Sequence, residues 1–315
     1  MQRYRISINS SDKKCLDLFF FFCRIATLRN MYKSHLESFM ERAYMKLIKK
    51  MLRPKKASQA DNYNTSLADT ISNEYPSFCA RAATNDSVFA TFRTNPVYMQ
   101  ILEHVDDIMG QKYLDYILKT RRFEPKDFEG FRQNDWYGGA SIRYYKEIGY
   151  MSPSTLRYIK VLGDLIESFG DLSNKDICEI GIGYGGQARI IMSMFDVKSY
   201  TFVDLDSVLS LSKKYLSHFS GLENKLHFKR MEDLEKRDYD LFISNYAFSE
   251  LRSNIQDIYI EKIIKNAKHG YITFNNIAPK DFNYPLEQYE SLFGKQIHIT
   301  DETPNSHPLN KILTW

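Results

Sequence analysis

The sequence predicts an α/β fold in which a doubly wound, mostly parallel sheet follows a mainly helical N-terminal region. Three observations support this: short apolar stretches alternate with amphipathic helical stretches from residue 151 onward, a glycine-rich turn follows the first strand, and two apolar runs close the chain. Strands that alternate with helices imply parallel pairing with helices on both faces. With 315 residues, 43% of them apolar, the chain can bury a substantial core.

Two helices are predicted ahead of the sheet from their start signals. Asn95 and Pro96 supply an N-cap and a first-turn proline, and apolar residues then recur at helical spacing as far as Ile117. Ser152 and Pro153 open the second helix in the same way. Between these helices, the aromatic-rich residues 121–149 are predicted to be irregular, which suits either contact with the apolar faces of sugars or simple packing.

The elements of the sheet domain follow from period and turn signals. Strands are expected at Asp176–Ile180, Ser199–Asp204, Leu226–Lys229, Tyr239–Asn245 and Tyr271–Asn275. Helices are expected at Gln187–Phe195, Ser207–Phe219, Ile255–Lys268 with a cap at Gly270, and Leu286–Phe293. The last two runs, Gln296–Thr300 and Lys311–Trp315, predict a closing antiparallel hairpin.

Charge is distributed unevenly along the chain. Residues 1–56 carry 14 Lys and Arg against 4 Asp and Glu, a net charge of +10, so the remainder carries about −6. The polar, proline-containing stretch 53–64 indicates a linker. We therefore predict a basic, partly apolar extension (1–56), a helical and loop region that shapes a substrate site (57–150), and a sheet domain (151–315).

The extension contains an apolar run, Leu16–Leu28, which is interrupted by Asp17 and Arg24. It is shorter than the roughly 20 residues that cross a bilayer, so no transmembrane helix is expected. No signal peptide is expected either, since no small-residue cleavage pattern follows. Two interpretations stay open: a helix packed on the main domain, or a basic amphipathic element on an anionic membrane surface. A start of the chain at Met31 or Met40 also stays open.

The cysteines indicate a reducing compartment. Cys15, Cys23, Cys79 and Cys178 form no C-x-x-C pair and have no zinc-binding spacing. Free thiols in the cytoplasm are the simplest interpretation, with a peripheral position on the inner face of the cytoplasmic membrane as the alternative that residues 1–56 would favour.

The strongest functional signal is the segment DICEIGIGYGGQ, residues 176–187. An apolar strand with Glu179 near its end runs into a glycine turn, whose candidate ligand-binding residues are Gly181, Gly183, Tyr184, Gly185, Gly186 and Gln187. Glycine allows backbone angles and close ligand approaches that other residues resist. Four glycines in six residues exceed what one turn requires, so the turn is predicted to bind a nucleoside cofactor.

The glycine pattern alone fits two cofactors. Gly181, Gly183 and Gly186 match G-x-G-x-x-G, and Asp204 lies at the spacing of a ribose-binding acid, as in NAD-binding folds. Glu179 favours S-adenosylmethionine, because a carboxylate there would meet the cofactor's ammonium group but would be poorly placed beside a pyrophosphate.

Four segments together resemble the sugar O-methyltransferase family. They are SPSTLRY (152–158), EIGIGYGGQAR (179–189), VDLDSVLSL (203–211) and ISNYAFSEL (243–251), and the resemblance extends from residue 134 to the C-terminus. The family comprises class I S-adenosylmethionine-dependent enzymes associated with bacterial surface polysaccharides. The resemblance therefore implies a Rossmann-like methyltransferase sheet, O-methyl transfer, and a sugar, nucleotide sugar or lipid-linked glycan as the acceptor.

Strand ends supply the remaining cofactor candidates, because ligands of open α/β sheets bind outside the carboxyl ends of the strands. Asp204, with Leu205 beside it, is expected to hold the ribose, and a helix N-cap is the competing role. The resemblance places Glu232 and Asp233 near the adenine, although a solvated acidic turn fits them equally well. Asn245 and Tyr246, after the fourth strand, are expected to frame the cofactor.

Three side chains are candidates for the base that removes the proton of the acceptor hydroxyl. Glu250 serves if burial raises its pKa, although a helix-start carboxylate is an equal alternative. His104 and His307 are the histidines placed to reach a cleft. No carboxylate cluster indicates a metal, so a metal-independent mechanism is expected.

Other functions are less favoured. Methylation of another small-molecule hydroxyl is the nearest alternative, and an NAD-dependent oxidoreductase is the more distant one. Nucleic acid is not an expected partner, because the fourth-strand loop contains SNYAF instead of an N-P-P-Y-type sequence and the basic charge lies in the extension.

Overall fold

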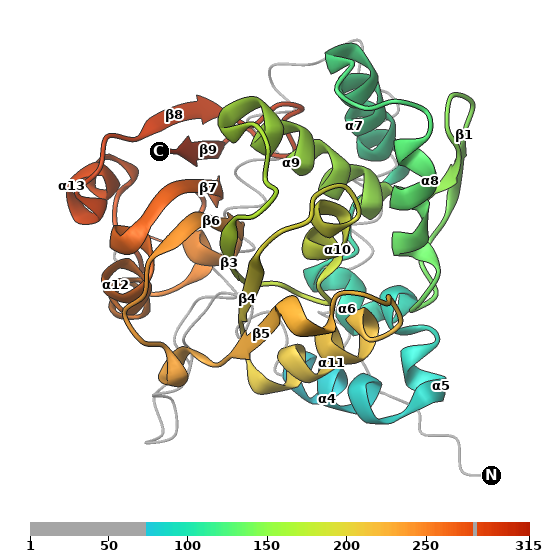
Figure 1. Ribbon diagram of the computed structural model, residues 1–315, viewed down its shortest axis with the longest axis horizontal. Coiled ribbons are helices and arrows are strands. Elements are labelled where there is room, and N and C mark those ends of the chain that lie inside the picture. Colours follow the sequence, from blue (N-terminus) through green and yellow to red (C-terminus); the bar gives the residue numbers. More distant parts are fainter. Residues whose placement is uncertain (1–73, 280–281) are drawn as a thin grey trace, which may run out of the picture. The chain divides into compact units, whose positions relative to one another are not determined.

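A seven-stranded sheet forms the centre of the computed structural model, which describes residues 74–279 and 282–315 (Figure 1). The predictions for the extension, the linker and membrane contact lie outside these residues. The strand order is β5-β4-β3-β6-β7-β9-β8. The strands are β3 (Asp176–Ile180), β4 (Ser199–Val203), β5 (Leu226–Lys229), β6 (Tyr239–Asn245), β7 (Ala267–Asn275), β8 (His298–Asp301) and β9 (Asn310–Thr314).

The sheet is parallel except at one edge. Strands β3 to β7 pair in parallel, whereas β9 is antiparallel to both β7 and β8. The predicted doubly wound sheet with a closing antiparallel hairpin is thus confirmed. The order also changes direction at β3, where β4 lies on one side and β6 on the other, and such a switch point is where open α/β sheets bind ligands.

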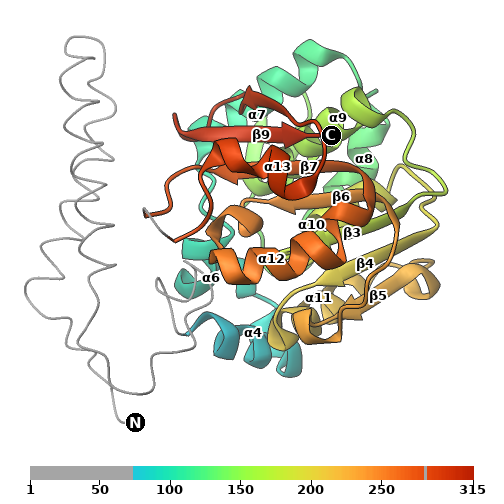
Figure 2. The same cartoon turned by 90° about the vertical axis from the view of Figure 1, so that its left-hand side faces the viewer.

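Each face of the sheet has its own core. In β3, Ile177 packs into one hydrophobic cluster, whereas Cys178 and Ile180 pack into the other. This alternation is expected because successive side chains of a strand point to opposite faces. The first face is covered by α9 (Pro153–Phe169), α10 (Gly186–Met192) and α11 (Asp206–Leu216), and the second by α12 (Ser253–Lys262) and α13 (Tyr289–Phe293), which lie in front of the sheet in Figure 2.

The helices that precede the sheet add a layer outside α9 to α11. They are α4 (Tyr75–Thr84), α5 (Asp86–Phe89), α6 (Pro96–Ile101), α7 (Asp107–Thr120) and α8 (Asp127–Arg132). Their buried side chains belong to the same hydrophobic cluster as the first face of the sheet. Residues 74–151 therefore pack directly on the sheet domain.

The predicted helix starts are confirmed, but the first helix is broken. The Asn95 side chain caps α6 by accepting from the N–H of Val97, and that of Ser152 caps α9 by accepting from the N–H of Thr155. The periodicity that predicted one helix through Ile117 spans two helices. Residues 102–106 interrupt it, because Asp106 caps a new start at α7.

The predicted helix through Lys268 is wrong, and so is its cap at Gly270. Helix α12 ends at Lys262 and β7 already begins at Ala267. Gly270 lies within β7, where a Cβ atom would come within 2.0 Å of the Trp315 ring. The glycine therefore makes room for an indole ring and does not end a helix.

The region predicted to be irregular contains regular elements. Besides α8, strands β1 (Arg143–Tyr145) and β2 (Gly149–Met151) form a hairpin. Tyr144 and Tyr150 pair across it with ring centroids 5.2 Å apart, and both rings are exposed. Trp136 is 64% exposed. These aromatic side chains are therefore available for contact with a ligand or partner.

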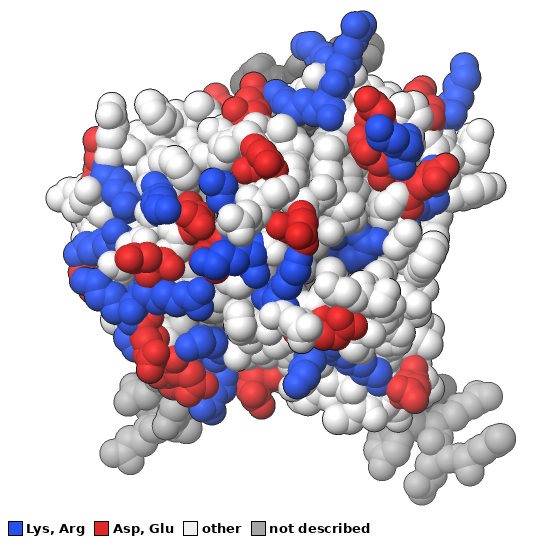
Figure 3. Space-filling view, viewed as in Figure 1, with Lys and Arg blue, Asp and Glu red and all other residues white. Residues whose placement is uncertain are grey.

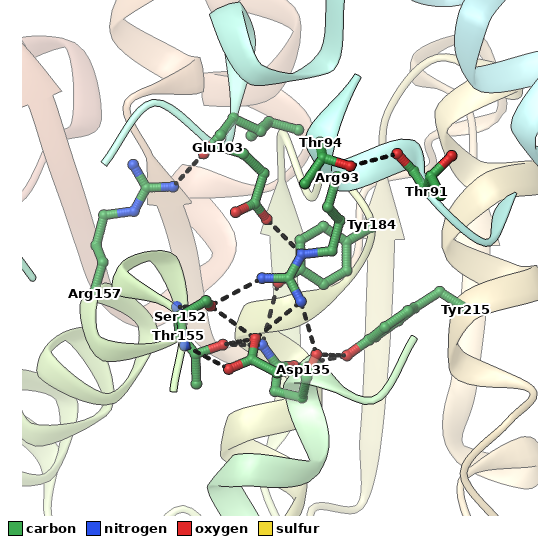
Figure 4. Close-up of polar contacts among 12 residues, drawn as sticks. Thr91, Arg93, Thr94, Glu103, Asp135, Ser152, Thr155, Arg157, Tyr184 and Tyr215 are labelled. Atoms are coloured by element: carbon green, nitrogen blue, oxygen red, sulfur yellow. Dashed lines mark hydrogen bonds and ion pairs between the residues drawn. The ribbon is translucent and has the colours of Figure 1, made fainter. Parts of the chain in front are cut away.

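A buried arginine ties the outer helices to the sheet domain (Figure 4). Arg93, which is 1% exposed, forms ion pairs with Glu103 at 2.7 Å and with Asp135 at 3.0 Å. Its guanidinium also donates to the carbonyl of Asn134 and the hydroxyl of Ser152, and lies 4.7 Å from the centre of the Tyr184 ring. We call Arg93, Glu103, Asp135, Ser152 and Tyr184 the Arg93 cluster.

The surface shows no strong separation of charge on the face seen in Figure 3, where basic and acidic side chains are interspersed. Over the residues that the structure describes, no helix is both long and apolar enough to span a bilayer.

Candidate functional site

The candidate site lies at the carboxyl edge of β3, β4, β6 and β7. Here the glycine turn (181–186) connects β3 to α10, and its backbone approaches neighbouring segments closely. Gly181 has φ +70°, and a Cβ atom there would lie 2.0 Å from that of Ala247 in the loop after β6. Gly183 has φ +55°, and a Cβ atom there would lie 2.7 Å from the Leu102 side chain. Only glycine fits both the backbone angles and the space.

Asp204 follows β4 and binds the glycine turn. Its carboxylate accepts from the N–H of Ile182 at 2.9 Å and from that of Leu205 at 2.7 Å. Burial raises the pKa of Asp204 to about 6, although these N–H donors oppose the rise. The carboxylate does not cap α11, because no side chain caps that helix. The competing N-cap role is thus not observed, whereas the ribose role stays a prediction.

Glu179 lies at the end of β3 with 2% of its surface exposed. Burial raises its pKa to about 8, while the Tyr200 hydroxyl, which donates to Glu179 at 2.7 Å, acts in the opposite direction. Among the described residues no cation pairs with this carboxyl. A buried acid of this kind gains its charge when a positively charged group of a ligand binds beside it.

Tyr184 and Gln187 are buried in the packing beneath the glycine turn. The Tyr184 hydroxyl accepts from the Asn134 amide at 3.2 Å, and its ring lies under Arg93 (Figure 4). The Gln187 amide donates to the carbonyl of Tyr158. Gly185, in the left-handed conformation, and Gly186 begin α10. The two side chains hold the turn in place, and their predicted contact with a cofactor is not tested.

Three further candidates lie on the surface beside the turn. Leu205 is 45% exposed next to Asp204. Glu232 and Asp233 are exposed in a 3₁₀ turn after β5, where both carboxylate oxygens of Asp233 accept from Arg230. This geometry agrees with a solvated acidic turn, and the predicted adenine contact stays a prediction.

A small pocket lies at the same edge, between the ends of β6 and β7 and helices α7 and α9. Its walls combine one apolar side chain with hydroxyl, amide and charged groups. The lining residues are Tyr113, Arg157, Tyr158, Lys160, Val161, Asn245, Tyr246, Thr273 and Glu302. Two of them, Asn245 and Tyr246, are the residues that the sequence places beside a cofactor.

Tyr246 adopts an unusual backbone conformation at the end of β6. Its φ of +67° is rare for a residue other than glycine, and its N–H donates to the carbonyl of Thr273 at 2.8 Å. The hydroxyl donates to Glu302 at 2.5 Å. Strained residues of this type concentrate at functional sites. Tyr246 thus links the end of β6 to the loop between β8 and β9.

Glu302 is a buried acid that sequence patterns did not reveal. Burial alone would raise its pKa, but hydrogen bonds from Ser306, Tyr246 and Asn310 lower it overall. Its carboxylate accepts from the N–H of Ser306 at 3.0 Å and from the Asn310 amide at 3.0 Å. Glu302 is therefore held in its charged form and is fully occupied by donors.

Glu250 is the predicted base with the most suitable titration. Burial raises its pKa to about 7, and the Asn275 amide is 3.4 Å away. It lies in a 3₁₀ turn that follows Tyr246. Thr273 lines the pocket, and Asn275, two residues later at the end of β7, points to the same face of the sheet. Glu250 contacts the Asn275 side chain, so it lies on that face as well.

The two histidine candidates occupy less suitable positions. His104 lies exposed in the turn between α6 and α7, where the nearby charge of Arg157 acts to lower its pKa and so makes its imidazole a weaker base. His307 lies in the loop between β8 and β9, and its Nδ1 accepts from the N–H of Leu309. The identity of the base stays a prediction. Within the described part of the chain, no group of three His, Cys, Asp or Glu side chains could hold a metal ion, and metal independence is not tested by this.

Arg157, Tyr113 and Glu302 were missed by sequence reasoning. Arg157 follows Leu156 in α9, a helix whose buried stripe was predicted from apolar residues alone. No sequence pattern marks Arg157, because its burial follows from the packing of α9 against its neighbours in the structure. Glu302 carries no local pattern, because only the antiparallel hairpin brings it to the ends of β6 and β7.

No protein-family model matches the chain, and none of the curated proteins compared with it matches. Solved structures with a similar fold include magnesium protoporphyrin IX methyltransferase from Synechocystis PCC 6803 with bound SAM, at 15% identity over 50% of this chain and 76% of that chain, with a TM-score of 0.39. An O-methyltransferase family protein from Burkholderia thailandensis has 12% identity over 51% and 56%, with a TM-score of 0.39. An S-adenosylmethionine-dependent methyltransferase from Mesorhizobium loti has 10% identity over 48% and 95%, with a TM-score of 0.38. All three TM-scores are below 0.5, so the fold and the chemistry of the site rest on the residues of this chain.

Proposed function

We propose that this protein is an S-adenosylmethionine-dependent O-methyltransferase that acts on a sugar hydroxyl in the biosynthesis of a bacterial surface polysaccharide or glycan. One observation carries the cofactor assignment. The glycine turn, the buried Glu179 carboxyl and Asp204 meet at the switch point of a seven-stranded sheet whose β9 is antiparallel. The four-segment family resemblance carries the choice of acceptor.

The residues at this edge fit the groups of the cofactor. Glu179 suits the ammonium group, because its buried carboxyl has no cationic partner in the described chain and the ammonium group would supply that partner. Asp204 suits the ribose hydroxyls, and the exposed Leu205 beside it suits the adenine ring. When bound, S-adenosylmethionine supplies a methyl group attached to a sulfonium sulfur.

Glu250 is the proposed general base. Transfer forms a bond between the acceptor oxygen and the methyl carbon while the carbon–sulfur bond breaks, and the hydroxyl proton passes to Glu250. At neutral pH, a carboxylate with a pKa of about 7 is deprotonated in about half of the molecules and still has enough affinity for a proton to accept one from the hydroxyl. The remaining catalysis comes from orientation of the acceptor beside the bound cofactor.

The acceptor class is proposed from two groups of side chains. Hydroxyl and amide groups that line the small pocket suit a single polar group of the acceptor, and the exposed rings of Trp136, Tyr144 and Tyr150 suit the apolar faces of sugars. A free sugar, a nucleotide sugar and a lipid-linked glycan are the acceptor classes. A lipid-linked acceptor agrees with a cytoplasmic enzyme whose residues 1–56 contact an anionic membrane.

An NAD-dependent oxidoreductase is the second candidate, favoured by the G-x-G-x-x-G match and the position of Asp204. Two observations favour the methyltransferase. The dinucleotide fold has the strand order 3-2-1-4-5-6 in an open, mostly parallel sheet, whereas here the antiparallel β9 is inserted beside β7. A carboxyl at the position of Glu179 gives a pyrophosphate no positive partner.

Calorimetric titration with S-adenosylmethionine, S-adenosylhomocysteine and NAD tests the proposal. We expect micromolar binding of the first two ligands and none of NAD, and binding of NAD alone would reverse the assignment. Asp204→Ala should abolish cofactor binding, whereas the matched control Asp206→Ala, at an exposed acid two residues away, should bind normally.

A further inference from the structure

We propose that Arg157 anchors an anion subsite in the pocket, and that this subsite takes a carboxylate or phosphate group of the ligand. The inference deepens the proposed function and relies on it for the identity of the ligand. The subsite itself follows from the surroundings of Arg157.

Arg157 is a buried cation without an anionic partner. It is 7% exposed, and its guanidinium donates one hydrogen bond, at 3.1 Å, to the backbone carbonyl of Leu102 (Figure 4). The centres of the Tyr158 and Tyr246 rings lie 5.6 and 5.8 Å from the guanidinium carbon, and the Tyr158 hydroxyl also interacts with the guanidinium. No carboxylate within residues 74–279 and 282–315 forms an ion pair with it. An arginine side chain keeps its charge in proteins, and burying that charge without a partner costs several kcal/mol.

The acidic groups around Arg157 are engaged elsewhere. Glu103 pairs with Arg93 at 2.7 Å, and Glu302 accepts from Tyr246, Ser306 and Asn310. The second cation of the pocket, Lys160, pairs with Asp164 at 2.7 Å. Arg157 is therefore the pocket cation that has charge available for a ligand.

A second donor in the same pocket points to the same chemistry. The amide of Asn245 interacts with the Glu179 carboxyl and lowers its pKa, but the buried Nδ2 atom makes no hydrogen bond of normal geometry within the described residues, while the Oδ1 atom accepts from Thr273 at 3.3 Å. An orphaned amide donor and a guanidinium in one pocket match an oxygen anion, which accepts charge-assisted hydrogen bonds from both. The hydroxyls of Tyr113 and Tyr158 complete a polar wall.

Arg189 shows what a structural arginine looks like in this protein. It is also buried, lies over an aromatic ring, that of Phe219, and has no carboxylate partner among the described residues. Its guanidinium, however, donates to the carbonyl of Gly130 at 3.0 Å and to the amide oxygen of Gln133 at 2.8 Å. It does not line the pocket, so it provides a matched control.

Two sources could supply the anion. The cofactor carries a carboxylate on its amino-acid portion, near the proposed ammonium site at Glu179. The acceptor could instead carry a uronate carboxylate or a phosphate. Both would meet the same guanidinium, and suitable probes separate them.

The test compares Arg157→Met, Arg157→Lys and the control Arg189→Met, each checked for a native circular dichroism spectrum. Each protein is titrated with S-adenosylhomocysteine, with 5′-methylthioadenosine, which lacks the amino-acid portion, and with galacturonate and inorganic phosphate. We expect Arg157→Met to weaken at least one carboxylate or phosphate probe tenfold or more. Arg157→Lys should restore part of that loss, and Arg189→Met should bind as the wild type does.

The pattern of losses identifies the source. Weaker binding of S-adenosylhomocysteine with unchanged binding of 5′-methylthioadenosine assigns the anion to the cofactor. Unchanged binding of S-adenosylhomocysteine with weaker binding of galacturonate or phosphate assigns it to the acceptor. Equal affinities of Arg157→Met and wild type for all four probes would overturn the subsite, as would a wild type that binds none of them.

The proposed function fails separately. If the wild-type protein binds neither adenosine probe, the methyltransferase assignment falls. The galacturonate and phosphate titrations still decide whether Arg157 binds an anion. If Arg157→Met does not fold, Arg157→Gln, which is polar but uncharged, carries the comparison, and an unchanged affinity profile in that folded variant overturns the subsite.

Discussion

Two buried arginines beside α9 have opposite surroundings: Arg93 contacts the Ser152 side chain that caps this helix, and Arg157 belongs to the helix itself. In the Arg93 cluster the guanidinium has two carboxylates, a carbonyl and a hydroxyl as partners. In the pocket Arg157 has one backbone carbonyl and aromatic rings. The first arrangement satisfies its charge within the chain. The second arrangement leaves the positive charge of Arg157 without an anionic partner in the described chain, so an anionic group of a ligand would satisfy it.

The same contrast extends to the acids of the two regions. Glu103 and Asp135 are paired with a cation, whereas Glu179 and Glu250 have none among the described residues, and burial raises their pKa values to about 8 and about 7. Ionisable groups that are costly to bury and have no oppositely charged partner mark sites where stability has been given up for binding. The difference predicts which substitutions damage the fold and which damage the function.

The largest effect is expected for Arg93→Met. It would leave the Glu103 and Asp135 carboxylates buried without a counter-charge, so the free energy of unfolding should fall by about 3–5 kcal/mol. Urea denaturation followed by circular dichroism measures it. The control Arg143→Met removes an exposed ion pair with Asp107 and should cost less than about 1 kcal/mol. Equal losses in both variants would show that the Arg93 cluster is not a structural anchor.

Glu250→Gln should reduce turnover by at least about 100-fold with little change in stability, because the general base is lost while the shape is kept. In the wild type, kcat should rise with pH as Glu250 loses its proton and level off above a pKa of about 7. The variant should lack that rise. Glu287→Gln, at an exposed position, is the matched control. Near-normal turnover of Glu250→Gln would redirect attention to His104 and His307.

Glu179→Gln should weaken binding of S-adenosylhomocysteine about tenfold, since a charge-assisted hydrogen bond becomes a neutral one. In the wild type the carboxyl is mostly protonated at pH 7 and must lose its proton to pair with an ammonium group. Affinity should therefore increase between pH 6 and 7.5, with release of up to about one proton per ligand at pH 7. Calorimetry in buffers of different ionisation enthalpy measures the release, and a variant that releases as many protons as the wild type contradicts the assignment.

Arg157→Met should have the smallest effect on stability. Removing a buried charge that has no anionic partner leaves no orphaned acid, so the free energy of unfolding should change by less than about 1 kcal/mol or increase. The same urea titration used for Arg93→Met measures it. A loss of 3 kcal/mol or more would place Arg157 with Arg93 as a structural cation and would weaken the contrast between the two regions.

Much of the sheet could be predicted because its strands carry local signals. Strands β3, β5 and β6 begin and end where apolar runs and turn residues place them. The errors arise where a packing partner distant in sequence, or a cap within a periodic stretch, decides the structure. Residues 267–270 have a helical composition, yet the Trp315 ring packs on Gly270 and the segment pairs with β6 as a strand. Asp106 likewise divides one periodic stretch into two helices.

The sequence could predict only those site residues that lie at the ends of consecutive strands. Glu179, the glycine turn and Asp204 lie at strand ends, so the alternation of elements brings them together. Arg157 and Glu302 meet at the pocket through α9 and the closing hairpin, which no spacing in the sequence reveals. The charge state of an acid also depends on its partners, and the partners of Glu302 come from three separate positions.

The contact between Leu102 and Gly183 has a kinetic consequence. The Leu102 side chain covers the backbone of the glycine turn, and its carbonyl accepts a hydrogen bond from Arg157. Tyr184 anchors the turn beneath Arg93, so the turn itself is the rigid partner. A ligand that approaches the Gly183 backbone would meet the Leu102 side chain, so we expect its rate of entry to depend on how readily that side chain moves aside.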